Sequence, residues 1–449
     1  MIISNILKIV NDPLHFDSLL IWNPIGEPNL NIYRIKRENL EKIKDVNYLN
    51  SNKRLHQNLK NLGIVFEDYN ELSLLKNKSL TTTSSKVSRI VIMTSSFCQL
   101  GCNNSDYGAY CGQEHEKFNV NLIEVEKVMN KVRRMISSSR KSSIELVFFG
   151  GEPLVNLGFL IEVMNRAKGL EQNNKVAIQG RVISNGLLLT SKMYQKLVDI
   201  GISYFEITLD GTQAVHDSRR PRKSGYGSFD KILSNLVSIS PIYCPENGEV
   251  VIRCNVDSRN EWDVFNLLGL LNESKVVPLM GFYVAPIRNW GNNKAKDNFE
   301  NRDRFSKLEI KVFSWLLRNG LTPLLIPENA ERSCIASADE PCVFAPDGNW
   351  YSCTEMPLVS KNHIKGSDRT WDDLDREGWY KAVAKETLPC TKCHFSSVCA
   401  GACPKDWLEG NIPCPSYVDN YSDRIKLFST SMNSKVINLD SIFYEGGAI

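Results

Sequence analysis

The stretch RIVIMTSSFCQLGC, residues 89–102, is an apolar run that leads directly into two cysteines, Cys98 and Cys102. The run predicts a strand at 89–94. A third cysteine, Cys111, follows after a gap of eight residues. Functional loops of parallel α/β sheets and barrels gather at the carboxyl ends of the strands, so we expect this cysteine loop at the mouth of such a sheet.

Strand and helix patterns alternate from this point on. The predicted strands are 89–94, 144–149, 176–183, 204–210, 249–256 and 281–285. The predicted helices are 122–137, 157–170, 191–200, 229–239 and 261–270, followed by a long one at about 299–317. Such alternation indicates parallel βαβ units, and six of them suit an open barrel. The expected fold class is therefore α/β, a partial (β/α)6 barrel.

The rest of the chain is divided between its two ends. Strand candidates at 18–22 and 30–35 precede helical patterns at 37–46 and 55–62. A polar, Ser/Thr-rich stretch near 76–88 is typical of a linker. We therefore expect a small α+β domain at 1–78, a linker at 79–88, the barrel at 89–325 and a cysteine-rich domain at 326–449.

Composition excludes several classes of protein. A chain of 449 residues can bury a sizeable core, and its net charge of +3 does not favour a nucleic-acid surface. The first residues lack the basic region and cleavage site of a signal peptide, and no apolar run is long enough for a transmembrane helix. We expect a cytoplasmic protein with neither nucleic acid nor membrane as partner.

Eleven of the thirteen cysteines fall into three spaced groups. Besides the first group, these are Cys334, Cys342, Cys353, Cys390, Cys393, Cys399, Cys403 and Cys414. Cys-x2-Cys and Cys-x3-Cys spacing without a signal peptide favours metal ligation over disulfides. Thiolates suit zinc or iron–sulfur clusters. The eight later cysteines divide into two complete sets of four ligands, whereas the three of the first group leave one iron of a cluster without a protein ligand. Of the remaining two, Cys254 is expected in the core and Cys244 to be a bystander thiol.

Three further motifs follow successive predicted strands. They are Gly150-Gly151-Glu152-Pro153, Ser184-Asn185-Gly186, and Thr208-Leu209-Asp210-Gly211 with His216, Asp217 and Arg220. Each alone could be an ordinary turn. In this order the chain resembles radical S-adenosylmethionine (SAM) enzymes of the SPASM subfamily, over about 89–415. In that family three cysteines hold a [4Fe–4S] cluster whose open iron chelates SAM, and one electron releases a 5′-deoxyadenosyl radical.

The resemblance implies roles for individual residues. Cofactor contacts are expected at Tyr110, Gly150, Gly151, Glu152, Pro153, Ser184, Asn185, Thr208, Arg220, Arg253 and Asn255. The last two share one face of a predicted strand, and structural hydrogen bonding is the alternative for them. Arg219 is expected to be a solvated surface charge. The family's usual loop is Cys-x3-Cys-x2-Cys, so the longer second gap here leaves Cys111 to serve as third ligand.

The eight later cysteines match the SPASM pattern. By resemblance, auxiliary cluster I takes Cys334, Cys342, Cys353 and Cys403, and auxiliary cluster II takes Cys390, Cys393, Cys399 and Cys414. With the SAM-binding cluster this makes three [4Fe–4S] clusters. Full ligation favours an electron-conduit role for the auxiliary pair. Two zinc sites are the alternative.

SPASM enzymes mostly modify peptides or proteins. The N-terminal unit resembles the element with which peptide maturases capture a leader by strand addition, although a cap without a binding role fits equally. The favoured hypothesis is a maturase that abstracts hydrogen from a ribosomally made precursor peptide with an N-terminal leader. It would install a cross-link or related oxidation and draw electrons from a reductant such as flavodoxin or ferredoxin. The bond formed, C–C, C–O or C–S, is left open.

Two alternatives remain at this stage. A sulfatase-maturing enzyme would make formylglycine, but such enzymes usually place an aspartate directly after the Gly-x4-Cys cysteine. Here Thr354 follows Cys353, and Glu355 stands one position further on. The other alternative is a non-catalytic electron carrier. Candidate proton acceptors, among which the residues do not choose, are Asp210, Glu206, His216 and Glu355.

Overall fold

The computed structural model describes residues 2–3, 7–24, 32–66, 68, 87–102, 119–138, 143–173, 176–288, 302–327, 334–338, 340–355, 388–408 and 411–444. The chain forms two compact units. The barrel unit holds residues 84–323 and 335–373, and the terminal unit holds 1–83, 324–334 and 374–449. The two ends of the sequence therefore share one unit.

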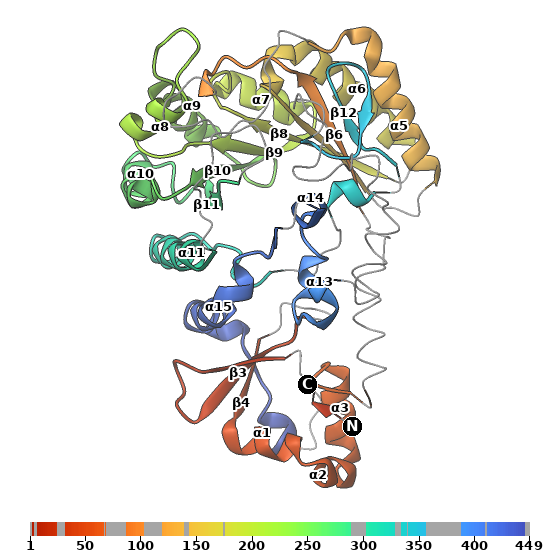
Figure 1. Cartoon of the computed structure of the whole chain (residues 1–449), viewed down its shortest axis with the longest axis vertical. Helices are drawn as coiled ribbons and strands as arrows, with labels where there is room; N and C mark the ends of the chain where they lie inside the picture. Colours follow the sequence, from red (N-terminus) through yellow and green to blue (C-terminus); the bar gives the residue numbers. More distant parts are fainter. Residues whose placement is uncertain are drawn as a thin grey trace. The chain divides into compact units, whose positions relative to one another are not determined.

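The barrel unit is built on an eight-stranded sheet with the order β11-β10-β9-β8-β7-β6-β12-β13 (Figure 1). Six strands are parallel and in chain order: β6 (Val87–Ser95), β7 (Ser143–Gly150), β8 (Ala177–Ser184), β9 (Ile202–Thr208), β10 (Glu249–Val256) and β11 (Gly281–Pro286). These are the six predicted strands, so the α/β fold is confirmed. Two short strands, β12 (Val343–Phe344) and β13 (Trp350–Tyr351), extend the sheet beyond β6; two residues carry too little periodicity to predict.

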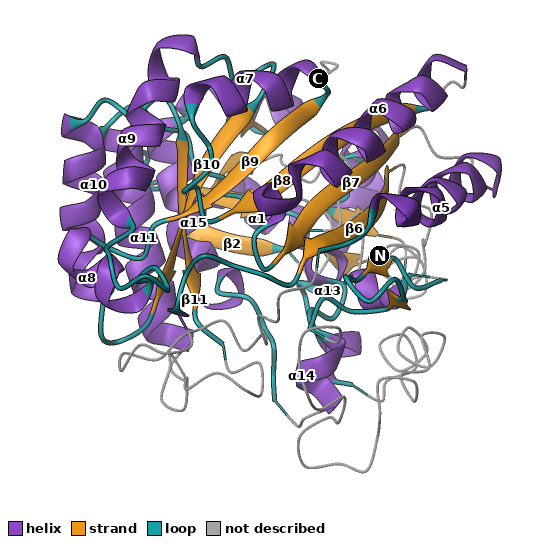
Figure 2. Cartoon of the chain, turned by 90° about the horizontal axis from the view of Figure 1, so that it is seen from above, coloured by secondary structure: helices purple, strands orange, loops and turns teal. Residues whose placement is uncertain are grey.

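Helices connect these strands and form an arc around them in the view of Figure 2. They are α5 (Val125–Ser138), α6 (Leu157–Asn173), α7 (Ser191–Asp199), α8 (Gln213–Arg219), α9 (Phe229–Ile239), α10 (Val264–Glu273) and α11 (Arg302–Arg318). Alternate strand residues such as Ile92, Phe148 and Ile252 are fully buried, whereas their neighbours line the opposite, inner face. The sequence did not predict α8, which carries the polar residues of one functional motif.

The terminal unit contains a four-stranded sheet with the order β14-β4-β3-β2. Its strands are β2 (Lys8–Asn11), β3 (Ser18–Trp22), β4 (Ile32–Lys36) and β14 (Ile437–Asn438). The helices are α1 (Arg37–Lys44), α2 (Val46–Ser51), α3 (Lys53–Asn61), α13 (Ser396–Cys399), α14 (Pro404–Leu408), α15 (Tyr417–Ser431) and α16 (Ser441–Tyr444), and β1 (Ile2–Ile3) pairs with β5 (Val65–Phe66). The predicted helix at 37–46 ends early because the Asp45 carboxylate accepts from Asn47 N and Tyr48 N and so begins α2.

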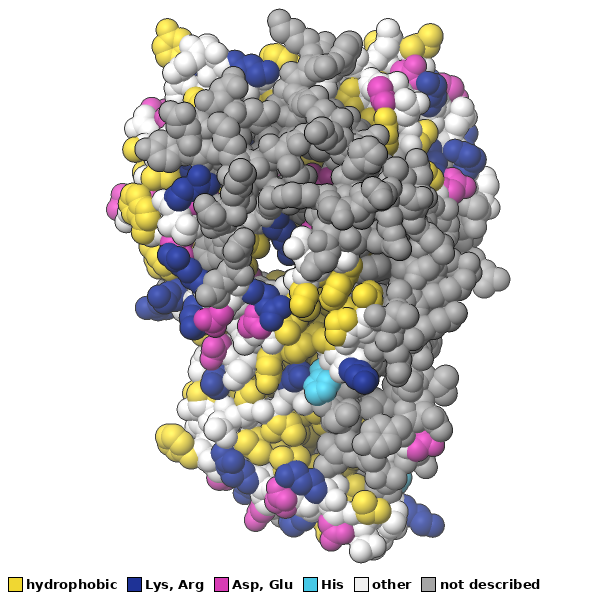
Figure 3. Space-filling view, viewed as in Figure 1, with side chains coloured by type: hydrophobic (Ala, Val, Ile, Leu, Met, Phe, Trp, Pro, Cys, Tyr) yellow, Lys and Arg dark blue, Asp and Glu magenta, His cyan; other side chains and the backbone are white. Residues whose placement is uncertain are grey.

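The surface gives little indication of a binding face by charge. Basic and acidic side chains lie interspersed over the described part of the face drawn in Figure 3. In the part of the chain that the structure describes, no helix is long and apolar enough to span a bilayer.

Candidate functional site

The turn after β7 is held against the loop after β6 by main-chain contacts. Gly151 N donates to Ser95 O, and Glu152 N donates to Phe97 O, both at 2.8 Å. A Cβ on Gly151 would lie 2.4 Å from Phe97 O, closer than real Cβ atoms approach. Gly150 has a φ of +123°, a conformation that favours glycine. Both glycines are therefore needed where the backbone of this turn meets the loop that carries Cys98.

Glu152 ties the end of β7 to the end of β8. Its side chain is fully buried. One carboxylate oxygen accepts from Ser184 Oγ (2.9 Å) and Leu154 N (3.0 Å), and the other accepts from Asn185 N (2.8 Å). Burial raises the pKa of Glu152 to about 7, although these hydrogen bonds favour the charged form. Pro153, also buried, follows in the same turn.

Asn185 in turn reaches the cysteine loop. Its Nδ2 lies 3.5 Å from Cys98 Sγ and 3.2 Å from Gln99 Oε1. Cys98 and Cys102 are both buried, and burial raises the pKa of Cys98 to about 12. A buried pair of soft donors with an amide aimed at one sulfur fits iron–sulfur ligation, because a bound cation stabilises the thiolate. The other expected residues of this loop, Tyr110 and Cys111, lie outside the described residues.

The same loop also pairs with the segment after α8, a contact that the sequence did not reveal. An isolated antiparallel bridge joins Leu100 to Arg222. Lys223 N donates to Gln99 O at 2.8 Å, and Lys223 Nζ lies 4.8 Å from the centre of the Phe97 ring. The cysteine loop is thus held on two sides, by the turn after β7 and by this segment.

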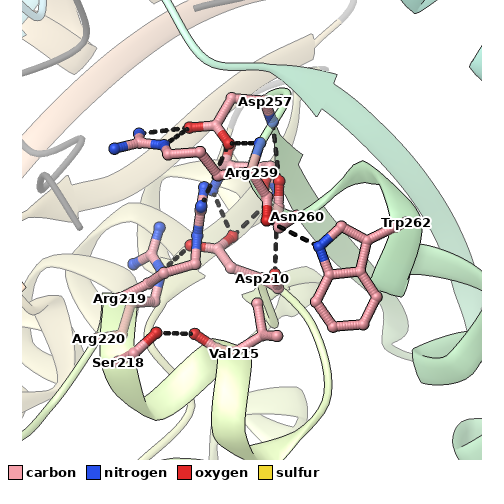
Figure 4. A network of polar contacts seen from close by, with 10 residues as sticks. Asp210, Val215, Ser218, Arg219, Arg220, Asp257, Arg259, Asn260 and Trp262 are labelled. Carbon is pink, nitrogen blue, oxygen red and sulfur yellow. Dashed lines mark hydrogen bonds and ion pairs between the residues drawn. The ribbon is translucent and has the colours of Figure 1, made fainter.

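Asp210 joins β9, β10 and α8 (Figure 4). Its carboxylate accepts from Asn255 N (3.0 Å), from Asn255 Nδ2 (3.1 Å) and from Arg220 Nε (2.5 Å). Burial opposes the charge of Asp210, but Arg220 and Arg219 outweigh it, so its pKa lies below the usual value. Arg220 and Asn255, both expected to contact the cofactor, are therefore oriented by one buried carboxylate.

His216, on α8, holds the main chain of Asp210. His216 Nδ1 accepts from Asp210 N (3.1 Å), and its Nε2 lies 3.0 Å from Ser228 Oγ. Because Ser228 Oγ donates to Arg220 O (2.7 Å), the imidazole must donate from Nε2. Burial lowers the pKa of His216 to about 4. The ring is neutral at pH 7, and both of its nitrogens make hydrogen bonds.

Arg219 corrects one sequence-based expectation. It is not a solvated surface charge but only 2% exposed. Its Nη1 lies 3.4 Å from Asp257 Oδ1, and Asp257 also pairs with Arg259 (Figure 4). The last residue of α8 faces the loop after β10, and the carboxylate there compensates its buried charge.

A second polar group lines the inner face of the sheet. Arg253 Nη1 lies 3.3 Å from Glu206 Oε1, and Tyr283 OH donates to Glu206 Oε2 at 2.8 Å. Arg253 Nε donates to Asn255 Oδ1, which shows that these two residues share a face as expected. Thr208 pairs in register with Arg253. Tyr283 was missed, although it stands between buried Phe282 and Val284 in an alternating strand.

The later cysteines are divided between the units. Cys342 and Cys353 belong to the barrel unit, whereas the other six belong to the terminal unit. Burial raises the pKa of Cys399 to about 12, and the neighbouring thiols of Cys414, Cys390 and Cys393 add to this effect. Burial also raises the pKa of Cys403 to about 11, with a contribution from Cys334. Within the described ranges no three His, Cys, Asp or Glu side chains are grouped closely enough to hold a metal ion.

Comparison with known proteins identifies the family. Residues 92–242 match the model of the Radical SAM superfamily. A cysteine-type anaerobic sulfatase-maturating enzyme of Clostridium novyi is 22% identical over 366 residues, which cover 78% of this chain and 96% of that protein. This chain is a radical SAM enzyme of the SPASM type.

Other relatives of this radical SAM enzyme differ in extent. The Fe-coproporphyrin III synthase of Methanosarcina barkeri is 30% identical over 140 residues, and the chain spans only 31% of its length. The solved structure of anSMEcpe with AdoMet and the Cp18Cys peptide has a TM-score of 0.52 at 17% identity, covering 78% of this chain and 99% of that one. At that identity the likeness concerns the fold alone.

The four candidate proton acceptors of this radical SAM enzyme differ in what they already bind. Both carboxylate oxygens of Asp210 and both nitrogens of His216 make buried hydrogen bonds. Glu355 N donates to Cys353 Sγ at 3.4 Å, so this residue adjoins an expected cluster ligand. Both carboxylate oxygens of Glu206 are bonded too, to Arg253 and Tyr283, but the side chain of Arg253 is 38% exposed.

Proposed function

We propose that this radical SAM enzyme is a peptide maturase, which abstracts a hydrogen atom from a precursor-peptide residue and installs a cross-link or related oxidation. The observation that carries the reaction class is the contact of Asn185 with the Cys98 loop. It brings the motifs after β6, β7 and β8 together at one mouth of the sheet. The observation that supports a peptide substrate is the terminal unit, in which a sheet containing β2–β4 is followed by α1–α3, and β3, β4 and the helices share a buried apolar core, as expected of a leader-capturing element.

The residues at the mouth have separable tasks in this proposal. Cys98, Cys102 and Cys111 would hold the SAM-binding cluster. Bound SAM, on receiving one electron, would supply the 5′-deoxyadenosyl radical that removes the hydrogen atom. Arg220, held by Asp210, presents a planar guanidinium suited to a carboxylate of the cofactor.

The substrate must then lose one more electron and one proton for a new bond to form by oxidation. We assign the proton to Glu206, because its carboxylate is paired with Arg253, whose side chain is 38% exposed, whereas Asp210 is fully buried. The electron would leave through two auxiliary [4Fe–4S] clusters held by the eight later cysteines, toward an external flavodoxin or ferredoxin that also supplies the priming electron.

A sulfatase-maturing activity is the second candidate. Its support is the extent of the match, since the relative from Clostridium novyi is covered over 96% of its length. Against it stands Thr354, which occupies the position where an aspartate is expected. A cysteine peptide that acquires an aldehyde, detected by hydrazine capture, would favour this second candidate.

The decisive experiment measures 5′-deoxyadenosine after anaerobic reconstitution with iron and sulfide, SAM and a reductant. The Cys98→Ala/Cys102→Ala variant should form none. Cys244→Ala is the matched control, because that thiol lies in a loop where it bonds only to Glu246 and Asn247 among the described residues. If the wild type binds iron fully but forms no nucleoside, the proposed maturase activity is replaced by the electron-carrier alternative.

A further inference from the structure

One edge of the sheet in the terminal unit is covered by the chain itself. Strand β14 pairs in parallel with β4, with Ile437 opposite Tyr33 and Asn438 opposite Arg34. Leu439 N continues the pairing by donating to Arg34 O at 2.8 Å. In Figure 1 the dark blue end of the chain lies beside the red strands β3 and β4. Strand β4 runs directly into α1, and its outer edge is therefore occupied by residues from the far end of the sequence.

A side chain extends this pairing beyond the strand. Asp440 Oδ1 accepts from Lys36 N at 3.0 Å and from Asn39 Nδ2 at 2.7 Å. A carboxylate thus takes the position that the next carbonyl of an added strand would have. Residues 437–440 satisfy β4 along its second half in the way that a bound extended peptide does.

Two apolar side chains anchor the same segment. Leu439 is fully buried and Ile442 is 7% exposed. They belong to the core that also contains Ile35, Leu40, Ile43, Leu55 and Leu59. The apolar layer between β4 and the helices α1 and α3 therefore accepts an apolar residue, an acid directly after it, and a second apolar residue three positions after the first.

We propose that the β4 edge and this apolar layer form a peptide-docking surface, and that residues 437–443 occupy it as an internal stand-in. A precursor peptide with the same pattern would compete for it in trans. This deepens the proposed function and rests on it for the identity of the partner. The occupant shows what the surface recognises: main-chain groups for β4, a carboxylate for Lys36 N and Asn39, and two apolar anchors.

Tethering makes the stand-in selective. A segment on the same chain competes at an effective concentration on the order of millimolar. At concentrations below that value, a free peptide displaces it only when its own contacts are clearly better than those of the stand-in. The surface would then reject weakly binding peptides and open for a peptide that improves on the stand-in.

The test uses a synthetic peptide of residues 434–444, SKVINLDSIFY, carrying a fluorescent label, and needs no SAM, cluster or turnover. A chain truncated after residue 435 should bind it at least about tenfold more tightly than the full chain. A peptide with Asp440→Ala should bind the truncated chain about tenfold or more weakly, because two hydrogen bonds to a charge are lost. Equal binding to both chains, or none to a folded truncated chain, overturns the proposal.

A second measurement covers the case in which truncation unfolds the terminal unit. Hydrogen exchange of the full chain should increase at residues 437–443, while β4 stays protected, when unlabelled peptide is added at roughly ten times the millimolar effective concentration of the tethered segment. Continued protection of 437–443 overturns the proposal. The full-length Asp440→Ala variant should bind the labelled peptide more tightly than wild type, whereas the matched variant Asp423→Ala, an exposed acid on α15, should not differ from it. Nucleoside formation, measured separately, reports on the proposed function.

Discussion

Two regions at the carboxyl ends of the strands hold the cofactor motifs by different physical means. Beyond β6 and β7, main-chain groups make the contact, and Gly151 N donates to Ser95 O. Beyond β9 and β10, buried charges make it, and Asp210 holds Arg220. The first region needs glycines, because a side chain would not fit there, whereas the second needs each buried charge to be paired with an opposite one. An added side-chain atom should therefore disturb the first region, and the loss of a charge or a change of pH should disturb the second.

The largest effect is expected from Asp210→Asn. The change leaves Arg220 without its buried counter-charge, which should lower the free energy of unfolding by about 3 kcal/mol or more. The pKa of Asp210 in the folded chain lies below that of an unfolded aspartate. The stabilisation that the Asp210 charge provides is therefore complete above about pH 5 and is lost as the pH falls through the folded pKa.

Urea unfolding at pH 7 measures the change. Asp303→Asn, in an exposed pair with Lys307, is the matched control and should stay within about 0.5 kcal/mol of wild type. A loss for Asp210→Asn no larger than that of the control would show that charge does not hold this region.

Gly151→Ala tests the main-chain region. Its Cβ would meet Phe97 O at 2.4 Å, so the cysteine loop must move, at a cost of about 1–3 kcal/mol in unfolding free energy. A displacement of this kind should reduce 5′-deoxyadenosine formation about a hundredfold.

The control for this change lies one helix away. Gly158 in α6 has open space around a new Cβ, and Gly158→Ala should stabilise the chain by about 0.5–1 kcal/mol with nucleoside formation unchanged. Wild-type nucleoside formation by Gly151→Ala would contradict the close contact.

A pH-dependent effect separates the regions further. His216 has a pKa lowered to about 4, so below pH 6.5 the unfolded chain gains a proton that the folded chain does not. Stability due to His216 is therefore lost as the pH falls from 6.5 toward 4, by about 2 kcal/mol between pH 7 and pH 5.

The comparison is wild type against His216→Gln, whose amide can keep hydrogen bonds to Asp210 N and Ser228 Oγ. Glu152, with its pKa raised to about 7, gives the opposite slope, but it is present in both chains and cancels in their difference. Identical pH dependence of the two unfolding free energies would remove His216 from the buried-charge region.

The sequence predicted the first region better than the second. The motifs at Gly150 and Asn185 follow strands whose apolar runs can be recognised in the sequence, and the carboxyl ends of parallel strands lie at the same edge of a sheet. Burial of Arg219 depends on Asp257, a partner 38 residues away in another loop, which no local pattern encodes. The same holds for β14, whose two residues become a strand only beside β4. The ligand roles of the cysteines and the division into three domains and a linker stay predictions.

The smallest effect is expected where the two regions meet, at Lys223. Its main-chain N donates to Gln99 O, whereas among the described residues its side chain contributes only a cation over the Phe97 ring, a contact that stabilises by about 0.5–1 kcal/mol at most. Lys223→Ala should therefore lower the unfolding free energy by no more than this and change nucleoside formation less than about twofold. A tenfold loss of nucleoside at unchanged stability would mean that the ammonium group, not the backbone bridge, couples the charged region to the cysteine loop. Main-chain pairing would then explain only the β7 side of that loop.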